Sequence, residues 1–251
     1  MIRLRAIIFD VYQTILEVGP PEVEPEEGWR RLWKRYFRSG PPFSFAEFQD
    51  RARQRIAEEH EEAKAFGIAY PEIYWPEVVA SILPDSVGAL DAEQRAVFLD
   101  DLAQVERSVR LMPGAEAVLT ELVRRSVRLG IASNSQPYTI RELQRHLPAG
   151  CPLSRFDTAY SFWSYRNGFS KPDPHVFRLI GARLRAEGVR SAEILMVGDR
   201  LDNDVEPARR QGWRTWHLSS SEKEGPPGSW AGSWEALYAR LFQSPEVEVG
   251  G

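Results

Sequence analysis

The chain has 251 residues, of which 43% are hydrophobic and 27% are charged, and its formal net charge is −4. This length and composition are ordinary for a globular protein and leave room for one large domain with a sizeable insertion. Because the net charge is negative, we expect no nucleic-acid partner and no binding to an anionic membrane. Cys151 is the single cysteine, which excludes an internal disulfide and is typical of the reducing cytoplasm.

The opening segment MIRLRAIIFD contains a short apolar run that ends at Asp10, too soon for a secretion signal. No segment reaches the roughly 20 apolar residues that a membrane-spanning helix needs. We therefore expect a cytoplasmic protein without membrane association. The run itself, LRAIIF, is continuously apolar, which favours a strand buried on both faces.

Between about Pro20 and Val109 the sequence changes character. Three segments carry apolar residues at helical spacing and are interrupted by Gly and Pro. They predict a helical domain, residues 18–108, inserted into a core of residues 1–17 and 109–251. Aromatic residues at helical spacing favour packing inside this insertion: Trp29, Trp33 and Tyr36. Three arginines of the insertion either contact an anionic substrate or are solvated surface charges, and the sequence leaves both interpretations open: Arg30, Arg31 and Arg38.

After the insertion, predicted helices and strands alternate. The helices span 112–127, 137–147, 172–188, 204–212 and 234–242, and the strands span 128–133, 157–162, 193–199 and 214–218. With the first strand, this alternation predicts an α/β fold, an open, parallel, doubly wound (Rossmann-like) sheet with helices on both faces. The Ser/Gly/Pro-rich segment 219–232 is predicted to be a loop, and the residues after the last helix are expected to fray.

Polar side chains follow the predicted strands. Asp10 ends the first strand, and Ser133 and Asn134 follow the second. Lys171 lies in the loop after the third strand, and Asp199 follows the fourth. Because open α/β sheets bind ligands beyond the carboxyl ends of their strands, we expect these side chains to meet in one crevice.

These residue types suit nucleophilic chemistry on an anionic substrate. Asp10 can attack and form a covalent ester or acyl phosphate. Attack by one anion on another needs cations, and Lys171 supplies one. Asp10 and Asp199 together offer the oxygen ligands that Mg²⁺ prefers. Ser133 and Thr14 can hold the oxygens of the transferring group.

Four motifs stand in order along the chain: FDVYQT, IASNS, SKPDPHVF and VGDRLDND. In this order they resemble the motifs of the haloacid dehalogenase (HAD) superfamily of hydrolases, and the helical insertion lies where that family places its cap. The resemblance implies that Asp10 is the nucleophile and forms an aspartyl-enzyme intermediate. It also implies that Thr14 and Ser133 contact the transferring group, and that Lys171 pairs with the nucleophile and the substrate.

The resemblance further implies a Mg²⁺ ion held by Asp10, Asp199 and the backbone carbonyl of Tyr12. Asp204 would order the waters around this ion or lie behind its ligands. We also count Tyr12 and Asn134 among the residues expected to bind a small anionic substrate, together with Ser133 and Lys171. The oligomeric state stays open.

Two positions depart from the family's phosphatases. Tyr12 stands where most of them have a second Asp, and Gln13 stands where they have a glycine. The missing Asp protonates the leaving group and then activates water, a role typically worth about 10²–10⁴-fold. A tyrosine, with an ordinary pKa of about 10, is a poor substitute near neutrality.

The first motif, DxYxT, resembles the dehalogenase branch of the family, in which halide leaves without a proton. The fourth motif, with Asp199 and Asp204, resembles the phosphatases. We favour a Mg²⁺-dependent phosphatase, because spare acids in a crevice are costly unless a cation is bound. A metal-independent 2-haloacid dehalogenase is the first alternative. A weakly active or inactive relative that binds a phospho-ligand or a protein is the second.

Overall fold

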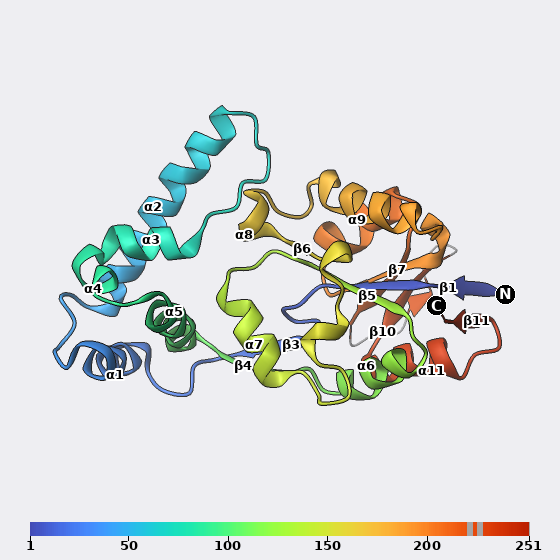
Figure 1. Cartoon of the computed structure of the whole chain (residues 1–251), viewed down its shortest axis with the longest axis horizontal. Helices are drawn as coiled ribbons and strands as arrows, with labels where there is room; N and C mark the ends of the chain where they lie inside the picture. The colour runs from blue at the N-terminus through green and yellow to red at the C-terminus, as the bar shows by residue number, and fades with distance from the viewer. Residues whose placement is uncertain (220–222, 225–227, 251) are drawn as a thin grey trace.

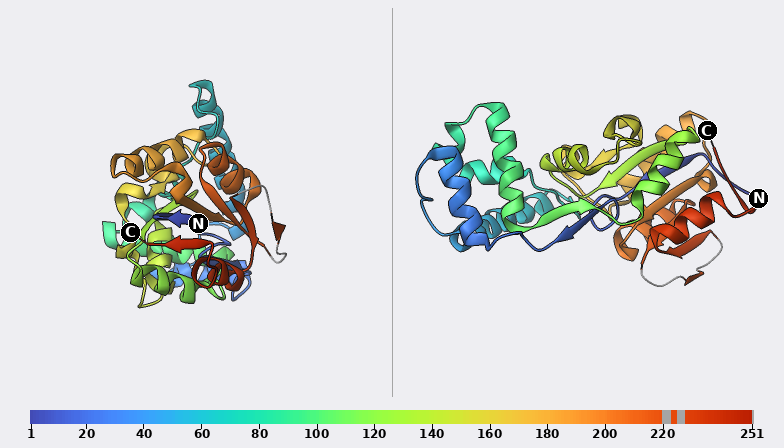
Figure 2. Two further views of the ribbon diagram at one scale, coloured as in Figure 1. Left: turned by 90° about the vertical axis from the view of Figure 1, so that its right-hand side faces the viewer. Right: turned by 90° about the horizontal axis from the view of Figure 1, so that it is seen from below.

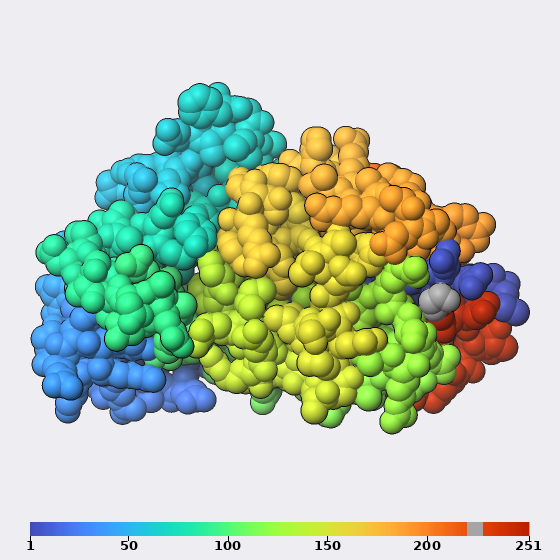
Figure 3. Space-filling view, viewed as in Figure 1, coloured from blue at the N-terminus to red at the C-terminus, as the bar shows by residue number. Residues whose placement is uncertain are grey.

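A computed structural model describes residues 1–219, 223–224 and 228–250. Figure 1 shows a central sheet flanked by helices and, at one end of the molecule, a separate group of helices, coloured blue to green, which the space-filling view shows from the same side (Figure 3). The two ends of the chain lie close together at the end of the sheet that is farther from this group (Figures 1 and 2). Within the described residues, none of the helices combines the length and the apolar character needed to span a membrane.

In the part of the chain that the structure describes, seven strands form the main sheet, in the order β6-β5-β2-β7-β8-β10-β9. Neighbouring strands are parallel, except β9 with β10. β2 (Ala6–Phe9) lies between β5 (Arg128–Ser133) and β7 (Ile194–Gly198), and all four of its residues are buried. The other strands are β6 (Phe162–Trp163), β8 (Arg214–Leu218), β9 (Lys223–Glu224) and β10 (Ser229–Gly232). The predicted α/β fold with a mostly parallel sheet is confirmed.

The side chains of β2 divide between two hydrophobic clusters, because successive residues of a strand point to opposite faces. Ile7 and Phe9 belong to one cluster, and Ala6 and Ile8 belong to the other. The first cluster includes residues of α6 (Ala115–Arg124), α7 (Tyr138–His146) and α11 (Trp234–Phe242). The second includes residues of α9 (Pro174–Ala186) and α10 (Glu206–Arg210). Helices therefore cover both faces of the sheet, as the apolar first strand predicts.

Five helices between Pro25 and Glu106 form the group at the opposite end, which we call the helical lobe (Figure 2). They are α1 (Pro25–Phe37), α2 (Phe45–Ala65), α3 (Trp75–Ile82), α4 (Pro84–Gly88) and α5 (Ala92–Glu106). The lobe has its own hydrophobic cluster, in which Trp29 and Trp33 are buried and Tyr36 packs against the cluster. The packing role predicted for these aromatic residues is confirmed.

A two-stranded antiparallel sheet connects the helical lobe to the rest of the chain. β3 (Leu16–Gly19) pairs with β4 (Ser108–Leu111), in the register Leu16 to Leu111 and Gly19 to Ser108. The predicted domain boundaries fall inside this connecting sheet. The division into two domains stays a prediction.

The predicted strand at residues 157–162 is wrong over most of its length. Thr158–Tyr160 form a 3-10 turn, and the pairing with β5 is limited to an isolated bridge from Phe156 to Leu129 and the two residues of β6 among the described residues. The cause is local, because the Asp157 side chain accepts from the Ala159 N–H at 2.7 Å and the Ser161 hydroxyl donates to the Asp157 carbonyl at 2.7 Å. Such side-chain bonds compete with an extended backbone.

Residues 247–249 form a strand, which corrects the expectation that the residues after the last helix fray. β11 (Val247–Val249) pairs in parallel with β1 (Ile2–Leu4), and Val247 and Val249 are buried against the first cluster. The loop prediction for 219–232 is wrong at residues 223–224, which form β9, and at residues 229–232, which form β10 beside β8. Residues 220–222 and 225–227 of that segment lie outside the described residues.

Candidate active site

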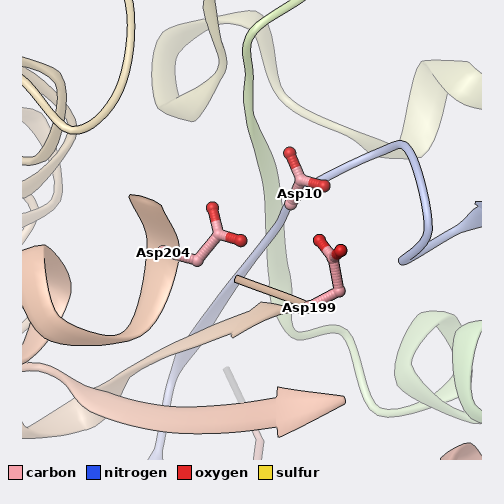
Figure 4. A group of neighbouring side chains, drawn as sticks. All are labelled: Asp10, Asp199 and Asp204. Atoms are coloured by element: carbon pink, nitrogen blue, oxygen red, sulfur yellow. The ribbon is translucent and has the colours of Figure 1, made fainter. Parts of the chain in front are cut away.

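The predicted site residues meet at the carboxyl ends of the central strands. Asp10 follows β2, Ser133 ends β5 and Asp199 follows β7. Lys171 lies in the loop before α9, and Asp204 lies in a short turn after β7. In Figure 4 the three aspartates come from separate segments and lie around a common space. Since β5, β2 and β7 are neighbours in the sheet, the strand order itself brings these residues together.

Lys171 lies between two of the aspartates. Its Nζ donates to Oδ1 of Asp10 at 2.6 Å and to Oδ1 of Asp204 at 2.5 Å, and its side chain is 2% exposed. Burial alone would lower the pKa of Lys171, but the attraction of Asp10 and Asp204 outweighs it and raises that pKa above its usual range. Lys171 is therefore a fixed positive charge beside the proposed nucleophile.

Asn134 holds the backbone of Lys171. Its Oδ1 accepts from the Lys171 N–H at 2.7 Å, and its Nδ2 donates to the Lys171 carbonyl at 2.9 Å. The two bonds use both the oxygen and the nitrogen of the Asn134 side-chain amide, and they hold the backbone of Lys171 so that its side chain lies against Asp10. The predicted contact of Asn134 with a substrate stays a prediction.

The aspartates form a compact acidic group. Asp10, Asp199 and Asp204 each offer a carboxylate oxygen, and these oxygens lie within 4.8 Å of one another. Asp204 approaches so closely because residue 198 is glycine: a Cβ there would lie 2.4 Å from Asp204 Oδ2. Within the described residues this is a group of hard oxygen donors without histidine or cysteine, which fits Mg²⁺.

Burial and mutual repulsion disfavour the charged forms of these carboxyls. Burial raises the pKa of Asp10 to about 7; Lys171 opposes this shift, and Asp204 and Asp199 add to it. Burial, followed by the charge of Asp204, also raises the pKa of Asp199. A bound cation would reverse both shifts by favouring the ionised carboxylates.

Two hydroxyls at the site have no protein partner. Thr14 Oγ1 and Ser133 Oγ are both buried, and neither has a hydrogen-bond partner within the part of the chain that the structure describes. Buried polar atoms are nearly always bonded in native proteins, so these two hydroxyls have the capacity to bond a partner from outside the chain. The oxygens of an anionic substrate group are suitable partners, as predicted for both residues.

The Tyr12 side chain is directed into the protein, toward α7. Its hydroxyl donates to Glu142 Oε2 at 2.5 Å and accepts from Arg107 Nη2 at 3.0 Å. Burial raises the pKa of Tyr12 well above its usual value; Arg107 opposes this shift, and Glu142 adds to it. The hydroxyl thus keeps its proton and points that proton at Glu142. Neither Arg107 nor Glu142 was expected from the sequence, where both look like ordinary charges near helix residues.

The arginines left open in the helical lobe lie on its surface. Arg30 and Arg31 each pair with the exposed Glu27 on α1, and Arg38 follows the end of that helix. The structure therefore gives Arg30 and Arg31 a local surface contact and adds no support for a substrate role of any of the three.

Gln13 has a left-handed backbone, with φ of 59°, at the position where the family's phosphatases carry glycine. We expect Gln13→Gly to raise the free energy of unfolding by about 0.5–1 kcal/mol, because glycine has no Cβ to strain this conformation. Urea denaturation measures the change. Ser126→Gly is a matched control far from the site in sequence, since Ser126 has φ of 55°. A loss of stability in Gln13→Gly alone would show that its bond from Nε2 to the Val18 carbonyl, at 3.2 Å, outweighs the strain.

Residues 4–212 match the family model of the haloacid dehalogenase-like hydrolases. This match covers most of the chain, and the chain belongs to that family of hydrolases. The four motifs and the sheet with Asp10 at its centre agree with this assignment.

Two curated relatives are phosphatases by name. Over 124 residues the chain is 36% identical to phosphoserine phosphatase of Thermus thermophilus, covering 49% of this chain and 47% of that protein. Over 107 residues it is 33% identical to glyceraldehyde 3-phosphate phosphatase of Pyrococcus abyssi, covering 43% of this chain and 42% of that protein. The matches thus span about half the length of these relatives or less.

Among solved structures, 2-haloacid dehalogenase from Pseudomonas syringae pv. tomato DC3000 is similar, with a TM-score of 0.55 at 19% identity. The match covers 89% of this chain and 90% of that protein. At this level of identity the likeness shows the common fold alone.

Proposed function

We propose that this hydrolase is a Mg²⁺-dependent phosphatase of a small phosphorylated metabolite, acting through an aspartyl phosphate on Asp10. The charge of the site carries the proposal. When all three carboxyls are ionised, the form that a bound cation favours, they carry three negative charges against the single positive charge of Lys171. A divalent cation with oxygen ligands offsets such a cluster, whereas a haloacid carboxylate would be repelled by it. The phosphatase relatives support the same choice.

In the first half of the proposed reaction, Asp10 attacks phosphorus. Lys171 holds Oδ1 of Asp10 at 2.6 Å and so fixes the rotation of the carboxylate. Thr14 and Ser133 donate their free hydroxyls to the phosphoryl oxygens. Asp10, Asp199 and the Tyr12 carbonyl would hold a Mg²⁺ ion, which would supply the positive charge that lets one anion approach another.

As the bond between Asp10 and phosphorus forms, the bond from phosphorus to the leaving oxygen breaks, and that oxygen keeps the electron pair. Water then attacks the phosphorus of the aspartyl phosphate, which releases phosphate and restores the carboxylate. The Tyr12 hydroxyl donates to Glu142 and is not available as an acid for the leaving oxygen. We therefore propose substrates whose leaving group departs without a proton, such as acyl or aryl phosphates.

We further propose that the helical lobe, residues 18–108, is a cap over a core made of residues 1–17 and 109–251. A cytoplasmic location and a small anionic substrate belong to the same proposal. Metal-independent dehalogenation of a 2-haloacid stays the first alternative, because the first motif is DxYxT. A weakly active or inactive binding protein is the second, because Tyr12 replaces the usual acid.

One experiment separates these functions. Purified protein is assayed for phosphate release from acyl, aryl and alkyl phosphates, and for halide release from 2-haloacids, with Mg²⁺ or with EDTA. The proposal predicts EDTA-sensitive phosphate release that is fastest with acyl and aryl phosphates. Halide release that EDTA leaves unchanged would establish dehalogenation instead. Phosphate binding without turnover on either panel would favour the inactive relative.

Mg²⁺ affinity should rise with pH and level off above about pH 7. Without the cation, the pKa of Asp10 is raised to about 7, so below that pH Asp10 carries a proton that must leave on binding. Each pH unit below this point should weaken Mg²⁺ binding by up to about 10-fold. Isothermal titration calorimetry between about pH 5 and pH 8 measures the Mg²⁺ affinity. An affinity that is flat across this range would show that no carboxyl of the site loses a proton on binding.

A further inference from the structure

A buried polar cluster holds the Tyr12 side chain next to the proposed nucleophile. We call it the Tyr12 cluster, and its members are Tyr12, Arg107, Thr139 and Glu142. The Tyr12 hydroxyl donates to Glu142 at 2.5 Å and lies 2.7 Å from Thr139 Oγ1. Arg107 Nη2 donates to the Tyr12 oxygen at 3.0 Å, and the guanidinium carbon lies 4.5 Å from the centre of the ring. The tyrosine is thus held both at its hydroxyl and at its ring face.

Glu142 is the centre of the cluster, and neighbouring donors compensate its negative charge. Its side chain is 0% exposed. Arg107 donates to its two oxygens at 2.9 and 3.1 Å, and Gln104 Nε2 donates at 2.8 Å. Removing any one of these donors would leave a buried carboxylate underpaired, which is costly. Glu142 is therefore a fixed anchor for Tyr12.

The Tyr12 cluster joins three parts of the chain. Tyr12 belongs to loop 10–14, which begins at Asp10, and Glu142 lies on α7 of the core. Arg107 lies between the end of α5 and the start of β4, where the helical lobe is attached. The cluster thus links the loop of the nucleophile to the attachment point of the lobe.

Besides the bonds at Asp10, contacts with distant parts of the chain hold loop 10–14 near its end and at its middle. Near its end, Trp234 Nε1 donates to the Thr14 carbonyl at 3.1 Å. At its middle, the Tyr12 cluster holds the side chain of the residue whose backbone carbonyl is expected to face the cation. A much shorter side chain at position 12, such as that of aspartate, would not make the same contacts. The tyrosine at this position therefore has a use other than acid catalysis.

We infer that Arg107 and Glu142 are positioning residues of the active site: through the Tyr12 side chain they fix the loop that presents the Asp10 carboxylate and the Tyr12 carbonyl. The expected effect on turnover rests on the proposed function. The expected effects on the loop itself and on Mg²⁺ binding require no phosphate substrate.

Glu142→Gln tests this role, because it removes the charge and keeps the size. With p-nitrophenyl phosphate we expect kcat to fall about 10-fold with little change in KM, and Mg²⁺ binding without substrate to weaken about 10-fold. Hydrogen–deuterium exchange of the amides in loop 10–14 should become faster. Arg107→Met should act in the same way, and Arg107→Lys should recover part of the loss.

Glu17→Gln is the matched control. Glu17 pairs with Arg110 across β3 and β4, so Glu17→Gln also removes an Arg–Glu pair where the helical lobe is attached. This pair is more exposed, with 73% of the arginine side chain and 30% of the glutamate side chain accessible. All readouts should stay at their wild-type values. The double variant Glu142→Met/Arg107→Met leaves no unpaired buried charge, so it should regain thermal stability without regaining kcat. Recovery of both would mean that the pair only stabilises the fold.

The readouts distinguish this inference from the proposed function. If the wild type hydrolyses no acyl, aryl or alkyl phosphate while loop exchange changes as expected in Glu142→Gln, the positioning role stands and the proposed function fails. If the wild type is a phosphatase and folded Glu142→Gln keeps its kcat and Mg²⁺ affinity, the inference is overturned. Unchanged exchange in loop 10–14 overturns it in either case.

Discussion

Asp10→Asn should abolish phosphate release, lowering kcat by at least about 10⁴-fold. The amide keeps the size of the carboxylate, but it is not a nucleophile and can form no acyl phosphate. It also loses the charge that pairs with Lys171 at 2.6 Å. The measurement is phosphate release from acetyl phosphate and p-nitrophenyl phosphate, with circular dichroism to show that the variant folds.

Asp202→Asn is the control for Asp10→Asn. Asp202 lies in the turn that carries Asp204, but it is exposed and pairs with Arg200. Its loss should leave kcat unchanged. Phosphate or halide release that persists in Asp10→Asn at the wild-type rate would contradict both the phosphatase and the dehalogenase interpretation, since each needs this carboxylate.

Lys171→Met should lower kcat by about 10³-fold, a loss typical of removing one preorganised donor from a developing charge. Without the ammonium, Asp10 and Asp204 face each other with nothing between them, and the pKa of Asp10 rises further because the attraction of Lys171 opposes its upward shift. The carboxyl is then protonated over more of the neutral range. Steady-state kinetics between about pH 6 and pH 9 should show the residual activity increasing toward high pH.

Lys64→Met is the matched control for Lys171→Met, because Lys64 is an exposed lysine paired only with Glu61. It should retain full activity. Lys171→Arg should stay well below the wild type, since the buried space between Asp10 and Asp204 is fitted to an ammonium, and a guanidinium is larger and planar. A Lys171→Met enzyme with unaltered kcat would show that the cation alone neutralises the site.

The direction of the Tyr12 hydroxyl has a kinetic consequence. In the family, the acid that Tyr12 replaces also activates the water that attacks the aspartyl phosphate. Tyr12 keeps its proton, bonded to Glu142, and so activates no water. Hydrolysis of the intermediate should therefore be slow compared with its formation, so that the phosphorylated enzyme accumulates during turnover.

The central strands could be predicted because each carries its own signal. β2, β5 and β7 are continuous apolar runs, which is the pattern of strands covered on both faces. β1 and β11 have three residues each and exist because Ile2 pairs with Val247, at the other end of the chain. No local sequence pattern predicts a pairing partner so far away in the chain. The strand predicted at 157–162 fails for the opposite reason, because the local bonds of Asp157 override its apolar character.

The same distinction applies to the site. The sequence places Lys171 after a strand, residues 157–162, that is mostly absent, and Lys171 reaches the site from the loop before α9. Asp10 and Asp199 could be predicted to converge because each follows a predictable strand of one parallel sheet. Glu142 could not, since its sequence surroundings indicate only an amphipathic helix. Its burial depends on Arg107, which lies 35 positions away in the sequence. The sequence shows that Tyr12 replaces an acid, but the direction of its hydroxyl depends on this same distant pair.

The central claim is that the phosphoryl group passes through Asp10. The direct measurement is an acid quench during turnover of p-nitrophenyl phosphate with Mg²⁺, followed by proteolysis and mass spectrometry of the peptide that carries Asp10. The account predicts a phosphorylated aspartate at that position, which disappears when EDTA replaces Mg²⁺ and is absent from Asp10→Asn. Phosphate released at the full rate while Asp10 stays unmodified at every quench time would contradict it.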